Sequence, residues 1–327
     1  MLEVKNLSTY FYVEDGELRA VDGLSYHVDK GEAVGLVGES ACGKSVSALS
    51  LMRLVPYPPG VIMGGEVIFK GTDLLAISED EIRTIRGGQI TIVFQEPTTS
   101  LNPLFSIKTQ ISEALTLHRN MDSQAAADES VRLLKQVGIP DPERRVNNYP
   151  HHFSGGMQQR IMLAMALACN PELLIADEPT TSVDVTVQAQ LLELIDNLRT
   201  EYGTAVIIIT HNLGVIARYV DRVHVMYAGR LVEVAETRPL FAEPLHPYTA
   251  GLLSSVPRLD LPRERELYVI GGAPPNLARL PSGCAFHPRC QYTINRCREE
   301  RPELEEVREG RYSACFRSRE MPELRKS

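Results

Sequence analysis

GESACGKS, residues Gly38 to Ser45, is the stretch that decides the fold of this chain. It follows the apolar run EAVGLV, and its last residue, Ser45, begins the helix-like run SVSALSLMRL. It satisfies the phosphate-loop pattern GxxxxGKS, in which backbone N–H groups surround phosphate oxygens, the lysine reaches the β and γ oxygens, and the serine binds Mg²⁺. Ala41 occupies a position where glycine is common, and this departure matters only if the residue requires a positive φ angle.

Four short apolar segments have the pattern of buried parallel strands, and each stops at a glycine or a polar residue. They are EAVGLVG ending at Gly38, QITIVFQ ending at Gln95, ELLIADE ending at Glu178, and AVIIITH ending at His211. Helical patterns lie between them, as in DESVRLLKQVG and VQAQLLELIDNLR. This alternation predicts an α/β fold with a parallel sheet, in which ligands bind at the carboxyl ends of the strands.

Composition and charge exclude several classes of protein. A chain of 327 residues is long enough for one large domain and an extension. The formal charge of −8 provides no basic field for a phosphate backbone, so nucleic acid is not an expected partner. The longest apolar run, Ile161 to Cys169, has about half of the roughly 18 apolar residues that a spanning helix needs, and it predicts a buried core helix.

The N-terminal sequence MLEVKNLSTYF carries acidic and polar residues where a secretory signal would be apolar, so we expect a cytosolic protein. A membrane role would then require a separate membrane subunit. The sequence has no internal repeat, which predicts one nucleotide-binding cassette per chain.

Two further motifs fit a phosphate-binding protein. ELLIADEP places Asp177 and Glu178 at a strand end, where an ordinary exit into a turn is the alternative reading. Beside a phosphate loop, Asp177 is the expected acid on the Mg²⁺ side, and Glu178 lies where a base could polarise water. FSGGMQQR predicts Ser154 as a helix N-cap followed by two glycines, which an anion approaching the helix N-terminus would explain.

The composition changes beyond about Arg238, since nine of the 21 prolines lie between Pro239 and Pro288. Prolines at this density exclude long helices and central strands, so residues 239–327 are predicted to form a loop-rich extension of a domain at 1–238. The extension contains four cysteines in a Cys-x5-Cys-x6-Cys-x17-Cys spacing: Cys284, Cys290, Cys297 and Cys315. In a reducing cytosol this cluster favours metal over disulfides.

The wide cysteine spacing lacks the tight pair of a usual structural zinc site and suits an iron–sulfur cluster. Zinc, and free or paired thiols, remain alternatives. Cys42 lies in the phosphate loop and is expected to be a small filler, although a helix N-terminus could lower the pKa of its thiol.

Several motifs together resemble the nucleotide-binding subunit of ATP-binding cassette (ABC) transporters. They are GESACGKS, Gln95, FSGGMQQR, LLIADEP, TTSVD and THN, in this order. FQEPTTSLNP, TTSVDVTVQAQ, AEPLHPYTAGLLSSVP and GCAFHPRC further resemble the dipeptide and oligopeptide importer branch, which also includes nickel importers. The likeness extends from about Leu2 to Phe316, and it implies a helical signature subdomain at about 96–165.

The resemblance implies a role for each motif residue. Phe11 would stack on adenine, Lys44 would contact the γ-phosphate, and His211 would hold the same phosphate. Ser45, Gln95 and Asp177 would bind Mg²⁺, while Gln95 would also sense the attacking water and Glu178 would be the base. The complete set of implied ATP-binding residues is Phe11, Gly38, Glu39, Ser40, Ala41, Cys42, Gly43, Lys44, Ser45, Ser154, Gly155, Gly156 and Met157.

The resemblance also implies an ATPase that energises import of dipeptides or oligopeptides from the cytoplasmic face of the cell membrane. Residues Ser154 to Met157 would contact the ATP of a second ABC ATPase subunit. Because the peptide branch usually has two distinct ATPase subunits, a heterodimer is the expected assembly. Two transmembrane permease subunits and an extracytoplasmic solute-binding protein would complete the transporter. Its cofactors would be Mg²⁺ and a four-iron four-sulfur cluster. Nickel or oligosaccharide import is an alternative, and a soluble ABC ATPase of DNA repair or translation is a more distant one.

Overall fold

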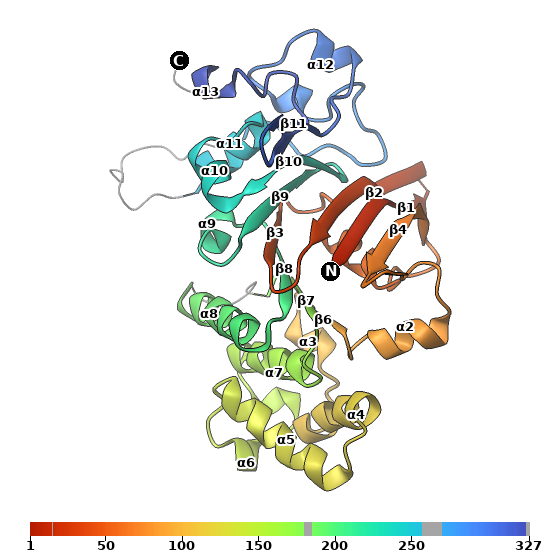
Figure 1. The fold of residues 1–327 in the computed structure, drawn as a ribbon, viewed down its shortest axis with the longest axis vertical. Coiled ribbons are helices and arrows are strands. Elements are labelled where there is room, and N and C mark those ends of the chain that lie inside the picture. The colour runs from red at the N-terminus through yellow and green to blue at the C-terminus, as the bar shows by residue number, and fades with distance from the viewer. Residues whose placement is uncertain (15, 180–184, 257–269, 325–327) are drawn as a thin grey trace. The chain divides into compact units, whose positions relative to one another are not determined.

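The chain forms two compact units, which are described separately below. The computed structural model describes residues 1–14, 16–179, 185–256 and 270–324. The first unit consists of Met1–Val28, Ala33–Leu75 and Thr210–Ser327, and the second consists of Asp29–Glu32 and Ala76–Ile209. Both units contain strands and helices (Figure 1).

The first unit contains an antiparallel sheet in the order β2-β1-β4-β5. Its strands are β1 (Leu2–Val13), β2 (Gly16–Val28), β4 (Gly60–Phe69) and β5 (Thr72–Asp73). Strand β1 pairs with both neighbours, so that Leu2 lies opposite Val28 on one side and Phe69 on the other. The hydroxyl of Thr9 on β1 lies 2.7 Å from that of Ser50, which ties this sheet to the helix after the phosphate loop.

The first unit also contains a mixed set of strands in the order β11-β12-β10-β9-β3. They are β3 (Ala33–Val37), β9 (Arg222–Tyr227), β10 (Arg230–Glu236), β11 (Glu305–Arg308) and β12 (Arg311–Ser313). Strands β3 and β9 are parallel, and the other pairs are antiparallel. Because β12 pairs with β10, the end of the chain extends the same set of strands that carries β3.

The helices of the first unit are short, and all but α1 and α9 lie in the C-terminal part. They are α1 (Lys44–Leu51), α9 (Leu213–Ile216), α10 (Thr237–Ala242), α11 (Pro247–Ser254), η2 (His287–Arg289), α12 (Arg296–Glu299) and α13 (Met321–Leu324). Among the described residues after Arg238, no helix is longer than the eight residues of α11. This fits the helix-breaking effect of the prolines there.

The second unit contains three neighbouring parallel strands in the order β8-β7-β6. They are β6 (Ile90–Val93), β7 (Leu173–Asp177) and β8 (Ala205–Thr210). Every residue of β7 and β8 is buried, as expected for apolar strands covered on both faces. Val93 lies opposite Ala176, and therefore β6 and β7 end at the same edge.

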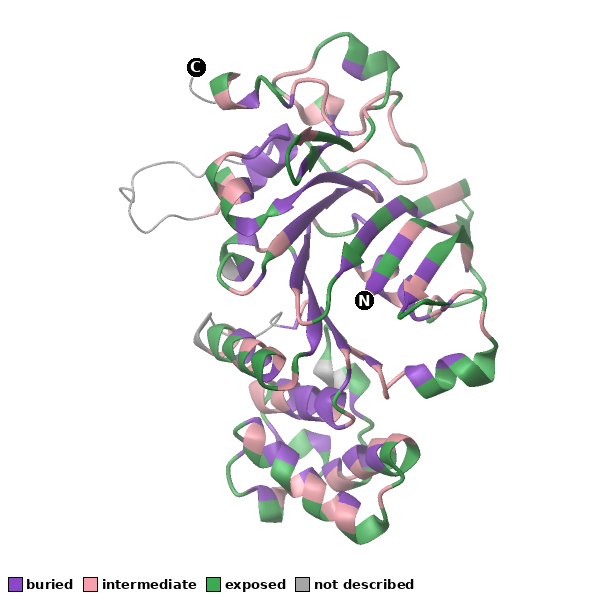
Figure 2. Cartoon of the chain, in the orientation of Figure 1, coloured by how far each residue is buried: buried purple, intermediate pink, exposed green. Residues whose placement is uncertain are grey.

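The other elements of the second unit are helices. They are α2 (Glu79–Ile85), α3 (Pro97–Ser100), α4 (Ile107–Arg119), α5 (Ser123–Gln136), α6 (Pro142–Arg145), η1 (Pro150–His152), α7 (Gly155–Leu167) and α8 (Val185–Tyr202). Helix α7 touches α3, α4, α5 and β6, and Figure 2 shows it largely buried. The apolar run that begins at Ile161 is therefore a core helix, as predicted. Of the helices in the described ranges, none has the length and apolar character needed to cross a membrane.

The four strands predicted from apolar segments are all present, as β3, β6, β7 and β8. The α/β fold with parallel strands is confirmed. The antiparallel sheet of the first unit was not predicted as a sheet, because its strands alternate between buried and exposed residues and pair over long separations in sequence.

The buried strand β7 provides a test of the core of the second unit. Ile175 is 0% exposed at the middle of this strand. We expect Ile175→Ala to lower the free energy of unfolding by about 2–5 kcal/mol, because it removes buried methyl groups and leaves a cavity. Urea unfolding measures the change. Arg83→Ala on α2 is the control, since that side chain is 70% exposed. If Ile175→Ala lowers the free energy of unfolding no more than Arg83→Ala does, the assignment of Ile175 to the core is wrong.

Candidate active site

The phosphate loop lies between β3 and α1, as its sequence predicts. Strand β3 ends at Val37, and α1 begins at Lys44. Two glycines, Gly38 and Gly43, permit the path of the loop from β3 to α1. A Cβ atom on Gly38 would collide with the carbonyl oxygen of Met226, and one on Gly43 would collide with that of Ala20. Gly43 also has φ of 105°, so both steric space and backbone conformation require glycine there.

Ala41 has φ of 61°, which is the left-handed region. Because φ is positive at Ala41, the replacement of the usual glycine by alanine has an energetic cost. An L-residue in this region costs roughly 1–2 kcal/mol, which the surrounding loop contacts must offset.

The ammonium group of Lys44 is held by the loop itself. Its Nζ atom donates to the carbonyl oxygens of Gly38 and Glu39, both at 2.9 Å, and lies 3.7 Å from the sulfur of Cys42. Lys44 is 4% exposed. Burial raises the pKa of Cys42, although Lys44 acts in the opposite direction, so the thiol fills space and is not activated.

Two candidate residues of the second unit meet at the carboxyl edge of its strands. Gln95 follows β6 and Glu178 follows β7, and Gln95 Nε2 donates to Glu178 Oε2 at 3.1 Å. Glu178 has φ of 46°, and its N–H donates to the carbonyl oxygen of Ile209 at 2.9 Å. A left-handed glutamate at a strand end is a strained conformation of the kind that concentrates at functional sites. Asp177 immediately before it is buried.

The FSGGMQQR motif forms the start of α7. Ser154 is the N-cap residue, as predicted, but its side chain makes no capping hydrogen bond. Ser154 and Gly155 are exposed, and a Cβ atom added to Gly155 would meet nothing within 4 Å. A Cβ atom on Gly156 would lie 3.2 Å from Val187 on α8. The helix N-terminus at Gly155 is thus open to a group from outside the unit.

The remaining predicted residues lie in the first unit. Phe11 is half-buried on β1, and its ring lies close to Gly60, whereas the neighbouring Tyr12 is 51% exposed. His211 follows β8 and is exposed. The TTSVD motif, Thr180 to Asp184, lies outside the described residues.

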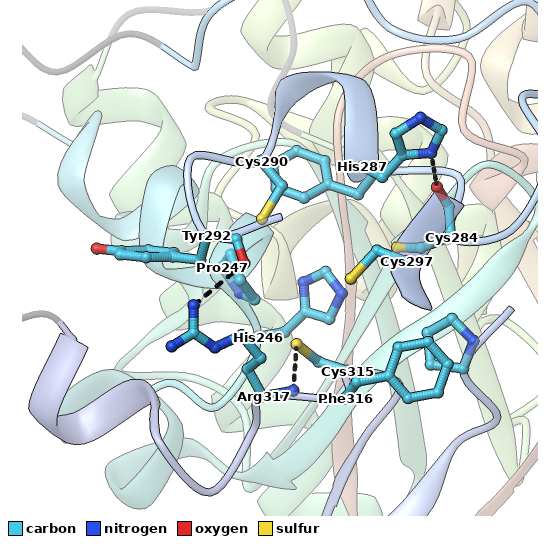
Figure 3. Close-up of a pocket in the computed structure, with 12 residues that line it drawn as sticks. His246, Pro247, Cys284, His287, Cys290, Tyr292, Cys297, Cys315, Phe316 and Arg317 are labelled. Atoms are coloured by element: carbon cyan, nitrogen blue, oxygen red, sulfur yellow. Dashed lines mark hydrogen bonds between the residues drawn. The ribbon is translucent and has the colours of Figure 1, made fainter. Parts of the chain in front are cut away.

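The four C-terminal cysteines line one pocket, and their sulfur atoms face its interior (Figure 3). All are free. Burial raises the pKa of Cys284 to about 11 and that of Cys315 to about 12. No group of three or more His, Cys, Asp or Glu side chains in the described ranges is arranged so that it could hold a metal ion. This finding does not support the predicted iron–sulfur cluster or the zinc alternative, and both stay predictions.

One contact of the phosphate loop was missed from the sequence. The guanidinium of Arg289 binds both carboxylate oxygens of Glu39, at 2.6 and 2.8 Å, and the hydroxyl of Tyr248 accepts from the Glu39 N–H at 2.7 Å. These residues come from the predicted extension. No local pattern could have paired residues that are 250 positions apart.

Comparisons with known proteins agree with this geometry. The family described as "ABC transporter" matches residues 21–181, and "Oligopeptide/dipeptide transporter, C-terminal region" matches residues 232–297. A probable peptide ABC transporter ATP-binding protein of Sinorhizobium fredii is 51% identical, with 99% of this chain and 97% of the relative covered. The oligopeptide transport ATP-binding protein OppD of Escherichia coli is 48% identical, with 97% and 93% covered.

A solved structure shows the same fold. The ATP-binding cassette MJ0796, as a dimer in a post-hydrolysis state with ADP and phosphate, matches with a TM-score of 0.66 and 26% identity. The match covers 73% of this chain and 99% of MJ0796. The chain belongs to the ABC transporter ATPases and carries the C-terminal region of the oligopeptide/dipeptide transporters.

Proposed function

We propose that this chain hydrolyses ATP to power the import of dipeptides or oligopeptides through a partner permease. The observation that carries the proposal is the loop Gly38–Ser45, in which two glycines allow close backbone approach and Lys44 is held over the loop. The peptide substrate is supported by the matched C-terminal region and by the peptide and oligopeptide transport named for the two relatives described above. These favour peptides over nickel, oligosaccharides or a soluble role in DNA repair or translation.

In the proposed mechanism the residues of the chain position ATP and the attacking water. Phosphoryl transfer depends mainly on alignment and charge neutralisation. Lys44 and His211 bind the γ-phosphate, while Phe11 stacks on adenine. Glu178 accepts the proton of the attacking water, and Gln95 orients Glu178 through their hydrogen bond.

Mg²⁺ fits the chemistry of the residues proposed to hold it. Ser45, Gln95 and Asp177 provide hydroxyl, amide and carboxylate oxygens, which are the hard ligands that Mg²⁺ prefers. When bound, Mg²⁺ neutralises charge on the phosphate oxygens. The backbone N–H groups of the loop bind the same phosphates from the protein side.

The working assembly in this proposal contains two cassettes. The exposed Ser154 and Gly155 at the start of α7 are suited to contact the ATP of a second subunit. We propose a related but distinct ABC ATPase as that subunit, with two permease subunits and an extracytoplasmic solute-binding protein. The chain then acts at the cytoplasmic face of the membrane. We further propose a cassette at 1–238, with its signature subdomain at about 96–165, and an extension at 239–327.

We also propose that Cys284, Cys290, Cys297 and Cys315 hold a four-iron four-sulfur cluster. The four thiolates would each ligate one iron of such a cluster, so they would not have to converge on a single ion. The Arg317 N–H donates to the sulfur of Cys315 at 3.4 Å. Such bonds stabilise bound thiolates.

Glu178→Gln tests the proposed base. The change keeps the size of the side chain and removes its basicity, so we expect ATP binding to persist and hydrolysis to fall by about 10²- to 10⁴-fold. Phosphate release and equilibrium binding of a fluorescent ATP analogue measure the two properties. Glu193→Gln on α8 is the matched control, because Glu193 is exposed and has no proposed role. Near-normal turnover in Glu178→Gln would remove this residue from the role of base.

Cys290→Ser tests the proposed cluster. After anaerobic purification we expect about four iron and four sulfide per unmodified chain, with visible absorption, and a loss of both in the variant because serine is a poor cluster ligand. Cys169→Ser is the control, since Cys169 lies in the other unit. A colourless unmodified protein with one bound zinc, or with four titratable thiols, would contradict the cluster.

A further inference from the structure

Arg289 connects the cysteine-containing segment to the phosphate loop. It lies in η2, immediately before Cys290, and its side chain is only 5% exposed. Its guanidinium grips the carboxylate of Glu39 with two parallel hydrogen bonds, while its Nε atom donates to the carbonyl oxygen of Gly271 at 3.0 Å. This bidentate geometry fixes both the position and the orientation of the Glu39 carboxylate.

An aromatic cluster supports this ion pair. Tyr227, Tyr248 and Phe286 pack together with ring centroids 4.6 to 5.4 Å apart. The guanidinium carbon of Arg289 lies 6.0 Å from the ring centroid of Tyr227 and 5.9 Å from that of Phe286. The arginine is therefore held by packing as well as by hydrogen bonds, which limits its freedom to leave Glu39.

Glu39 is itself in an unusual place for an acid. It is the second residue of a loop proposed to bind the highly negative phosphates of ATP, and a carboxylate there repels them. The same residue supplies one of the two carbonyl oxygens that hold Lys44. A neutralised and fixed Glu39 is compatible with phosphate binding, whereas a free carboxylate opposes it.

We infer that Arg289 is a positioning residue for ATP: it neutralises Glu39 and fixes the phosphate loop, so that the C-terminal segment sets the affinity of the loop for nucleotide. The inference rests on the proposed binding of ATP by Gly38–Ser45. It predicts that loss of Arg289 weakens ATP binding because the Glu39 carboxylate then stays unneutralised beside the phosphates.

The test compares three variants of the full-length chain by their Kd for Mg·ATP and Mg·ADP. Arg289→Gln should raise both Kd values by roughly 5- to 150-fold, the usual range for coupled sites. Glu39→Gln alone removes the negative charge and leaves the Arg289 cation beside the loop, so both Kd values should fall. Arg289→Gln combined with Glu39→Gln should recover most of the lost affinity, which a purely structural role for Arg289 would not produce. Added salt should lessen the defect of Arg289→Gln, since it screens the repulsion.

Arg308→Gln is the matched control, because Arg308 is in the same segment but pairs with Glu243 in an exposed position. If Arg289→Gln does not fold, Arg289→Lys replaces it, with a smaller rise in Kd that Glu39→Gln again reverses. An unchanged Kd in Arg289→Gln or its lysine substitute, or a defect that Glu39→Gln does not relieve, overturns the inference. Failure of the unmodified chain to bind ATP would instead refute the proposed function.

Discussion

The close approach of backbone to backbone at the phosphate loop is the constraint on which the first unit depends. Gly38 and Gly43 lie against the carbonyl groups of Met226 and Ala20, and no side chain fits at either position. These contacts join the loop to β9 and to β2, so the strands determine where α1 begins. The N-terminus of α1 and the Lys44 ammonium are consequently presented from a rigid support.

In the second unit, the ends of the parallel strands position the candidate site residues. Because β6 and β7 are parallel and in register, the residues after them emerge at one edge, and Gln95 meets Glu178 there. The strained backbone of Glu178 is held by a hydrogen bond to β8. Buried apolar strands thus provide the stability that keeps a polar, strained residue in one conformation.

Local patterns allowed much of this to be predicted from the sequence. The four apolar strands, the loop at Gly38–Ser45 and the N-cap position at Ser154 each depend on a few consecutive residues, and all are present. The bond between Arg289 and Glu39 could not be predicted, since it depends on how the end of the chain folds back. The positive φ angle at Glu178 could not be predicted either, because nothing in the local sequence distinguishes a strained glutamate from an ordinary one.

The C-terminal region contacts the phosphate loop and extends the set of strands that carries β3. Strand β12 pairs with β10, and Tyr248 and Arg289 reach the phosphate loop. The four cysteines line a pocket that Phe286 of the aromatic cluster also lines. The pairing of β12 with β10 and the ion pairs Arg289–Glu39 and Arg301–Asp22 hold this region against the rest of the first unit. The loop and the C-terminal region therefore form one structural unit.

The central claim is that the loop Gly38–Ser45 binds the phosphates of ATP through Lys44. The most direct measurement is the Kd for Mg·ATP of the full-length chain and of Lys44→Ala. A charged hydrogen bond contributes about 1.5–3 kcal/mol, so we predict affinity about 10- to 100-fold weaker in the variant. Equal affinity in the two proteins, at equal folded stability, would contradict the account.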